Sequence, residues 1–221
     1  MTMRALRLNG AILLAAIALC GSAAAQQQAP QSIAGGLERV QGSKVALAYL
    51  RPGTDWTKYR TILLKTLAVP ANARNAAPPG AVTEFGESYM LNDSDVAQLQ
   101  SAFAQSMHNV LGNAGYTFVT TPQSDTLIVA PEIKQIYLNA PTESSRLTNS
   151  NPGMTLSQGG GSITMGAVLA DGTTRVVLGE VLDRKYGSNV WGVNNSASNL
   201  GDARQAFDGW ASDLKNKLQS E

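Results

Sequence analysis

Two stretches of the chain, far apart in the sequence, repeat apolar side chains at every third or fourth position. The first runs from Asn92 to Leu111, and the second begins near Asp202. This spacing places the apolar residues on one face of an α-helix. They are Val96, Leu99, Phe103, Met107 and Val110 in the first stretch and Ala203, Phe207, Trp210, Leu214 and Leu218 in the second. Each helix must bury this face against another surface, which constrains the fold more than any other feature.

The ends of both stretches carry residues typical of helix termini. Asn92 and Asp95 offer capping oxygens and negative charge at the start of the first, and glycines follow its end. In the second, Asp202 with Gln205 three residues later resembles a capping box. We therefore predict that the second helix begins near Asp202.

The segments outside the helices carry strand-like patterns. Pro131 interrupts one of them and, because proline cannot donate to a ladder, is expected at a sheet edge or a bulge. Two others flank Asp171 and Gly172, a pair that favours a hairpin with a type I′ turn. The predicted strands are residues 61–69, 116–120, 126–138, 163–170 and 173–186.

Together these elements predict an α+β fold. Two amphipathic helices and several strands bury their apolar faces most economically as a single mixed, mainly antiparallel sheet with both helices packed on one face. The length of 221 residues suits one domain, which we place at residues 38–221.

The N-terminal residues have the three parts of a secretory signal peptide. Two arginines precede an apolar stretch from Ala11 to Cys20, and small residues end at Ala25. Cleavage after Ala25 would leave a tether, residues 26–37, which is rich in Gln, Ala and Pro and lacks periodicity. The pattern predicts an exported, periplasmic protein.

Cys20 is the only cysteine, and its position allows a second interpretation. A bacterial lipoprotein is lipidated on a cysteine at the end of its signal, which would anchor this chain to the outer membrane. The residue before that cysteine is normally small, whereas Leu19 is bulky. Both interpretations stay open, and in each the domain after residue 25 has no thiol for a disulfide or a metal.

The charge pattern argues against nucleic-acid partners. Lys and Arg number 17 and Asp and Glu number 16, with no long block of either sign. Such a chain lacks the basic surface that binds phosphate backbones. Contact with a membrane is expected only through a lipid on Cys20.

No residue pattern names a reaction, and we expect no cofactor, no metal and no catalytic residue. His108 is the only histidine, so a Ser-His-Asp set would depend on it, and no G-x-S-x-G elbow is present. The run Gly159–Gly161 lacks the lysine of a phosphate loop. Several carboxylates lie in or beside predicted strands and leave a hydrolase open as the alternative. They are Asp125, Glu132, Glu180 and Asp183.

Spacing weakens the simplest of those carboxylate pairs. Glu180 and Asp183 differ by three positions, so in a regular strand they point to opposite faces. Asp183 with Arg184 and Lys185 is better interpreted as a solvated charge cluster. Four aromatic residues could form a ligand platform, although two of them, Tyr59 and Trp210, have core positions. The four are Trp56, Tyr59, Trp191 and Trp210.

With these elements in order, the chain resembles the bacterial envelope family known as domain of unknown function 3313, whose members are often described as lipoproteins. The resemblance covers about residues 40–218 and implies an exported, envelope-associated α+β domain, without an established activity or catalytic residues. Its most specific part is the C-terminal helix. The matching segments are Leu50–Gly53, Asp55–Trp56, Tyr59–Arg60, Asp125–Leu138 and Gly201–Asp208, followed by Trp210, Ala211 and Leu214.

These observations favour a non-enzymatic envelope accessory or binding protein. Its expected partner is another envelope protein or a cell-wall component. The long polar stretch from Asn139 to Ser162 and the predicted sheet edge near Pro131 are the candidate contact regions. A carboxylate-based periplasmic hydrolase or glycan-processing enzyme is the alternative.

Overall fold

The computed structural model describes residues 29–77, 89–138, 140, 155–157, 161–187, 192–194 and 196–220. Within them, eight strands form one sheet in the order β1-β2-β3-β9-β8-β6-β4-β5. The strands are β1 (Ser32–Ile33), β2 (Leu37–Arg39), β3 (Leu47–Leu50), β4 (Thr61–Leu64), β5 (Thr117–Phe118), β6 (Thr126–Tyr137), β8 (Ser162–Asp171) and β9 (Val177–Tyr186).

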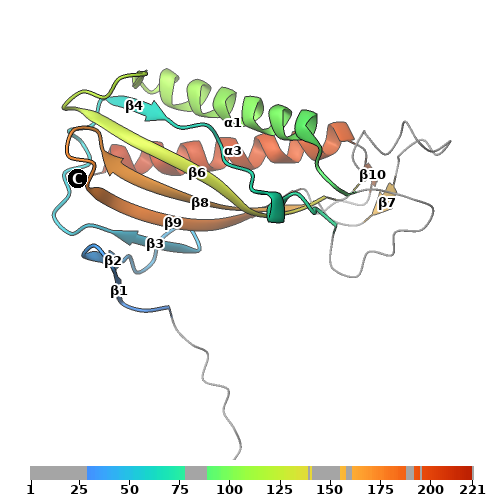
Figure 1. The fold of residues 1–221 in the computed structure, drawn as a ribbon, viewed down its shortest axis with the longest axis horizontal. Helices are drawn as coiled ribbons and strands as arrows, with labels where there is room; N and C mark the ends of the chain where they lie inside the picture. Colours follow the sequence, from blue (N-terminus) through green and yellow to red (C-terminus); the bar gives the residue numbers. More distant parts are fainter. Residues whose placement is uncertain are drawn as a thin grey trace, which may run out of the picture.

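The predicted fold class is confirmed. Strand β4 runs parallel to β5 and β6, and the remaining pairs in the sheet are antiparallel. Helices α1 (Asp93–Asn113) and α3 (Ser196–Leu218) lie side by side on one face of the sheet, and no helix of the described chain covers the other face (Figure 1). A short 3-10 turn, η1 (Ala71–Ala73), and a separate pair of strands, β7 (Thr155–Ser157) and β10 (Gly192–Asn194), complete the described elements.

Helix α1 forms where its periodicity and its cap predict it. The Asn92 side chain accepts the N–H of Asp95, and the Asp95 side chain accepts the N–H of Asn92, both at 2.9 Å. This reciprocal capping box satisfies two N–H groups that the first turn leaves unpaired. The chain leaves the helix through Gly115, whose φ of +90° glycine adopts without strain.

Helix α3 begins at Ser196, earlier than predicted. The expected capping box at Asp202 was therefore wrong, because Asp202 lies inside the helix. Gly201 does not interrupt the helix, and Leu200, three residues before Ala203, extends the apolar stripe by one turn and packs against the core. The predicted stripe itself is confirmed, with Ala203, Phe207, Trp210 and Leu218 buried.

The core lies between the helix pair and the sheet. Phe103 of α1 and Phe207 of α3 meet edge to face, with ring centroids 5.3 Å apart and planes at 90°. This geometry places the positive ring edge of one against the negative face of the other. Both rings are almost fully buried and contribute to one continuous apolar cluster with the inner face of the sheet.

The predicted hairpin is confirmed, but its turn differs from the expected type I′. Strands β8 and β9 pair antiparallel, and residues 172–176 connect them, with a positive φ of 63° at Arg175. Asp171 organises this longer turn, because its Oδ1 accepts the N–H groups of Thr173 and Thr174. Gly172 is needed for space, since a Cβ there would lie 2.7 Å from the carbonyl oxygen of Thr126.

Of the two positions predicted for Pro131, a sheet edge or a bulge, the sheet edge was wrong, and the register shift of β6 lies nearby, between Ile133 and Gln135. Pro131 lies in β6, an interior strand, and is paired with Ala167 of β8. Its carbonyl accepts the N–H of Ala68 at 3.0 Å, on the side where β4 has already ended at Leu64. The missing N–H therefore interrupts no regular ladder, and the region is no longer a candidate edge for partner binding.

The segment predicted as a tether is ordered in its C-terminal part. Strand β1 pairs with β2 through a turn at Gly35 and Gly36, which both have positive φ. Leu37, only 1% exposed, and the hydrogen bond from the Tyr49 hydroxyl to the Pro30 carbonyl fix this segment to the sheet. Ser32–Leu37 is thus part of the domain edge, which corrects the flexible tether expected up to residue 37.

Several predictions fall outside the described residues. These are the signal peptide with Cys20, the glycines Gly159 and Gly160, and Trp191. Most of the polar stretch from Asn139 to Ser162 also lies outside them.

Candidate functional site

An apolar hollow lies between α3 and the sheet. It has a volume of about 420 Å³ and lies under the C-terminal half of α3, toward the end marked C in Figure 1. Ligand sites in proteins typically enclose roughly 300–1,000 Å³ and are mainly apolar. We call it the helix–sheet cavity; its walls include Phe103, Met107, Val129, Met165, Ala167, Val181, Trp210 and Leu214.

Asp183 fixes three walls of this cavity to one another. The residue is 8% exposed, and its Oδ1 accepts the N–H of Ala46 at 2.9 Å. Its Oδ2 accepts the indole N–H of Trp210, also at 2.9 Å, and lies 3.3 Å from the Lys185 ammonium. One buried carboxylate thus joins β9, the loop before β3, and α3. The interpretation of Asp183 as part of a solvated charge cluster was wrong.

Lys185 extends this network to the outer part of α3. Its ammonium lies 3.0 Å from the Asp213 carboxylate. Burial lowers the pKa of Lys185, but its hydrogen bond to Asp213 and the charges of Asp213 and Asp183 outweigh burial and raise the pKa above its ordinary value. The lysine therefore stays protonated at neutral pH and neutralises part of this acidic pair.

Two lysines other than Lys185 line the cavity itself. Lys44 is exposed in the loop between β2 and β3, and no ion pair joins it to a carboxylate of the described residues. Lys217, near the end of α3, places its ammonium 5.4 Å from the centroid of the Trp56 ring. Such a cation–π contact leaves the positive charge uncompensated by any carboxylate. The cavity thus combines an apolar interior with cationic side chains at its boundary.

A second depression lies on the sheet face opposite the helices and has a volume of about 440 Å³. Glu132 and Lys134 form an ion pair of 2.7 Å there, and Glu180 lies in the same depression. Val168 and Leu182 expose 39% and 36% of their surfaces on these strands. This open face is more polar and more solvated than the helix–sheet cavity.

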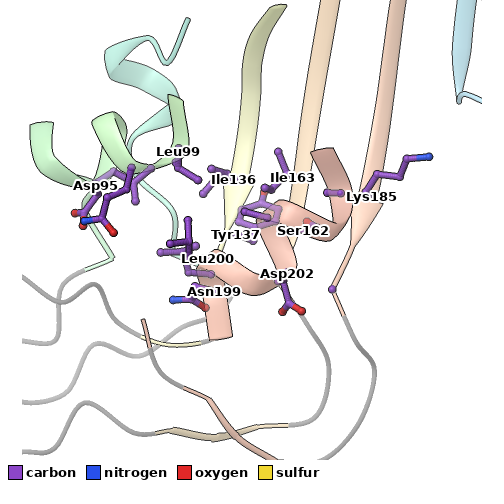
Figure 2. A pocket seen from close by; sticks show the side chains of 17 residues that line it. Asp95, Leu99, Ile136, Tyr137, Ser162, Ile163, Lys185, Asn199, Leu200 and Asp202 are labelled. Carbon is purple, nitrogen blue, oxygen red and sulfur yellow. The ribbon is translucent and has the colours of Figure 1, made fainter. Parts of the chain in front are cut away.

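A third hollow lies near the opposite end of the helices (Figure 2). Side chains from both helices and from β6 and β8 surround it, among them Leu99, Ile136, Ile163 and Leu200. Its volume of about 70 Å³ holds only a few waters, since each needs roughly 10–15 Å³ by this measure. Among the three described hollows it is the poorest candidate for an organic ligand.

The four candidate carboxylates do not converge. Asp183 lies against the helices and Glu180 on the open face, so their predicted opposite orientation is confirmed. Asp125 precedes β6 and accepts a hydrogen bond from the Thr61 hydroxyl at 3.3 Å. Only Glu132 and Glu180 share a depression.

The remaining pair, Glu132 and Glu180, comes from backbone positions two strands apart. Glu132 of β6 pairs with Gly166 of β8, which in turn pairs with Leu182 of β9. Glu180 of β9 pairs with Val168 of β8, two residues away from Gly166. A two-strand separation with a two-residue offset puts the two backbones about 12 Å apart. Glu132 is moreover engaged by Lys134, so the arrangement does not favour paired-carboxylate chemistry.

The remaining candidates have structural positions. His108 is exposed on α1 with its ring stacked near Phe118, at 3.8 Å between centroids. Within the described residues, no group of three His, Cys, Asp or Glu side chains could hold a metal. Tyr59 is fully buried and Trp210 is 5% exposed, which confirms their core positions. No helix of the described chain has both the length and the apolar character to cross a bilayer.

A second buried carboxylate, Asp171, has a structural role at the β8–β9 turn. Its Oδ2 accepts hydrogen bonds from Lys58 at 3.1 Å and from the Tyr59 hydroxyl at 3.0 Å. The hydrogen bond from the N–H of Thr174 lowers the pKa of the Asp171 carboxyl most, and the hydrogen bonds from Lys58 and Tyr59 lower it further. Burial raises this pKa, but the hydrogen bonds outweigh burial, so the pKa lies far below its ordinary value. Burial raises the pKa of the Tyr59 phenol. The cluster joins the turn to the Lys58–Tyr59 segment.

Sequence reasoning missed the cavity, whose walls come from segments far apart in the chain. The one available signal was Asp183, a carboxylate at an inward position of a predicted strand. An inward charge in a strand needs partners and often marks a site.

Comparison with known proteins identifies the family. The described fold is an α+β domain with an apolar cavity and a buried Asp–Trp–Lys network. Residues 34–214 match the family described as proteins of unknown function, DUF3313, and the chain belongs to this family. No curated protein matches the chain.

Solved structures resemble this chain only distantly. The PelC dodecamer from Paraburkholderia phytofirmans is 10% identical, with 76% of this chain and 96% of that chain covered and a TM-score of 0.41. Protein XCC0632 from Xanthomonas campestris is 10% identical (75% and 86% covered, TM-score 0.42), and the hypothetical protein CT253 from Chlamydia trachomatis is 9% identical (74% and 99%, TM-score 0.42). Likeness at this level carries no argument about activity or assembly.

Proposed function

We propose that this protein is an exported, non-enzymatic binding protein of the bacterial cell envelope, and that the helix–sheet cavity holds an apolar part of another envelope component. The observation that carries the proposal is the cavity itself: about 420 Å³, lined mainly by apolar side chains, and shaped by a buried hydrogen-bond network. Proteins do not usually maintain an apolar hollow of this size without a ligand, because tight packing is the more stable arrangement.

The network around Asp183 supports a binding role. All of its strong partners are structural, since Ala46, Trp210 and Lys185 occupy both carboxylate oxygens. A carboxylate engaged in this way holds the cavity walls at a fixed separation. Binding sites built on rigid elements with buried polar supports are pre-organised for a ligand.

Export is supported by the sequence alone. The segment up to Ala25 has the pattern of a secretory signal, and cleavage there would release the domain into the periplasm. Lipidation of Cys20 would instead anchor it to the outer membrane. An intact-mass measurement of the exported protein distinguishes a chain that begins at Gln26 from one that begins at a lipid-modified Cys20.

Site-specific photo-crosslinking in living cells tests the binding role. A photoreactive amino acid replaces Lys44 at the cavity boundary, and in a control strain it replaces Gln105, which is exposed on α1 away from the cavity lining. The proposal predicts that an envelope molecule is captured from position 44 and not from position 105. Capture from neither position, or equally from both, would contradict it.

A further inference from the structure

The interior of the helix–sheet cavity offers apolar contact and no free polar side chain from Asp183 or Trp210. Both oxygens of Asp183 are engaged by its three partners, and the Trp210 indole N–H is used by Asp183. Met107 and Met165 in the walls are flexible and adapt to the shape of an apolar ligand. The interior therefore suits a hydrocarbon chain better than a sugar, a nucleotide or a polar peptide.

The charges that line the cavity favour an anion. Lys44 and Lys217 line the cavity, and so do Asp183 and Asp213. Lys185 is not part of this lining, but its ammonium contacts both aspartates and adds a third positive charge beside them. Lys185 already contacts both aspartates, whereas Lys44 and Lys217 are paired with no carboxylate of the described chain. The uncompensated positive charges are thus those of Lys44, which is exposed, and Lys217, which is half-buried.

From these two observations we infer that the helix–sheet cavity binds a single-chain amphiphile with a carboxylate head group, that is, a long-chain fatty carboxylate. The hydrocarbon chain lies among the apolar walls, and the carboxylate lies at the boundary beside Lys44 or Lys217. This inference rests on the proposed function, because it names the ligand class of the same site.

Calorimetric titration with decanoate, dodecanoate and tetradecanoate, each below its micelle-forming concentration, tests this inference on the chain without its first 25 residues. We expect one site per chain. The affinity should rise roughly fourfold for each added methylene until the cavity is filled, as the burial of hydrocarbon predicts. Dodecyltrimethylammonium, with a similar chain and a positive head group, should bind at least tenfold more weakly than dodecanoate.

Two neighbouring residues of β8 provide a matched pair of variants. Ala167 lines the helix–sheet cavity. Val168 is the next residue of the strand, so its side chain points to the opposite face of the sheet, and it is 39% exposed on the open face. Ala167→Phe should reduce dodecanoate affinity at least tenfold, and Val168→Phe should leave it unchanged. Because Ala167→Phe could disturb packing, the double variant Lys44→Gln/Lys217→Gln provides an independent test at the surface and should weaken dodecanoate severalfold without weakening dodecyltrimethylammonium.

The outcomes separate this inference from the proposed function. Absence of dodecanoate binding, equal binding of the two head groups, or equal loss in both β8 variants would overturn the fatty-carboxylate assignment. If the photoreactive residue at position 44 then captures a protein segment or an uncharged lipid, the binding role survives and only the ligand class is wrong. If position 44 captures nothing and dodecanoate does not bind, both fail.

Discussion

The indole N–H of Trp210 donates a hydrogen bond to Oδ2 of Asp183 over 2.9 Å, and this contact links α3 to β9. The other carboxylate oxygen accepts the N–H of Ala46, in the loop before β3. Three segments that form walls of the helix–sheet cavity thus meet at one buried carboxylate. Hydrogen bonds to a buried charge are among the strongest in proteins, and the loss of one partner leaves the charge undersatisfied.

Replacement of Trp210 by Phe should measure the strength of this link. The variant keeps most of the apolar ring but removes the donor, so we expect a loss of about 1–3 kcal/mol in the free energy of unfolding by urea. In a double-mutant cycle with Asp183→Asn, the two effects should be non-additive by about 1 kcal/mol or more. Strict additivity would show that the contact contributes nothing to stability.

Substitution of Gly172 should destabilise the β8–β9 turn through lack of space. A Cβ at this position would lie 2.7 Å from the Thr126 oxygen and 2.8 Å from the Thr126 Cβ, both in a well-packed strand end. We expect Gly172→Ala to cost about 1–3 kcal/mol. Gly201→Ala is the matched control, because no atom lies within 4 Å of its Cβ position in α3, and it should stabilise the protein by about 0.5–1 kcal/mol. Equal effects of the two substitutions would refute the steric explanation.

The acid stability of the protein should depend on Asp171. The pKa of Asp171 in the folded state lies well below the ordinary value of 3.8. The ionised carboxylate therefore stabilises the fold fully above about pH 5. This contribution is lost as the pH falls below about 4 toward the folded-state pKa. Asp171→Asn should therefore cost about 2–3 kcal/mol at pH 7 and progressively less at lower pH.

Urea unfolding of the wild type and the Asp171→Asn variant between pH 7 and pH 2.5 gives this dependence. Asp208→Asn, at an exposed position of α3, is the control and should change stability by less than about 0.5 kcal/mol. A stability difference between wild type and Asp171→Asn that stays constant over the whole pH range would disprove the role of the ionised carboxylate.

The open-face carboxylates separate the binding role from the hydrolase alternative. We expect Glu132→Gln and Glu180→Gln to leave both the yield of molecules captured from position 44 and the thermal stability essentially unchanged, because neither side chain lies in the helix–sheet cavity. If either glutamate proved necessary for the cellular phenotype while the variant stayed folded, chemistry on the open face would have to be reconsidered.

The sheet and the helix pair could be predicted because their signals are local. The spacing from Val96 to Val110 and the capping residues at Asn92 and Asp95 define α1 within one segment of chain. The start of α3 was missed because Gly201 resembles an interruption and Asp202 resembles a cap. The stripe continues to Leu200, whose contact with the core comes from tertiary packing.

The candidate site could not be predicted because its contacts are distant in sequence. The partners of Asp183 are 27 residues away at Trp210 and 137 residues away at Ala46. A single sequence shows only that Asp183 and Glu180 face opposite sides of a strand. It does not show which segment covers the inward carboxylate, so Asp183 resembled a surface charge.

Native mass spectrometry of the protein, extracted gently from the envelope of its own host, tests most directly whether the cavity is occupied in the cell. We predict that wild type and Val168→Phe carry a bound mass consistent with a single-chain lipid, and that folded Ala167→Phe lacks it. A bare chain in all three proteins, or the same bound mass on all three, would contradict a binding role for the helix–sheet cavity.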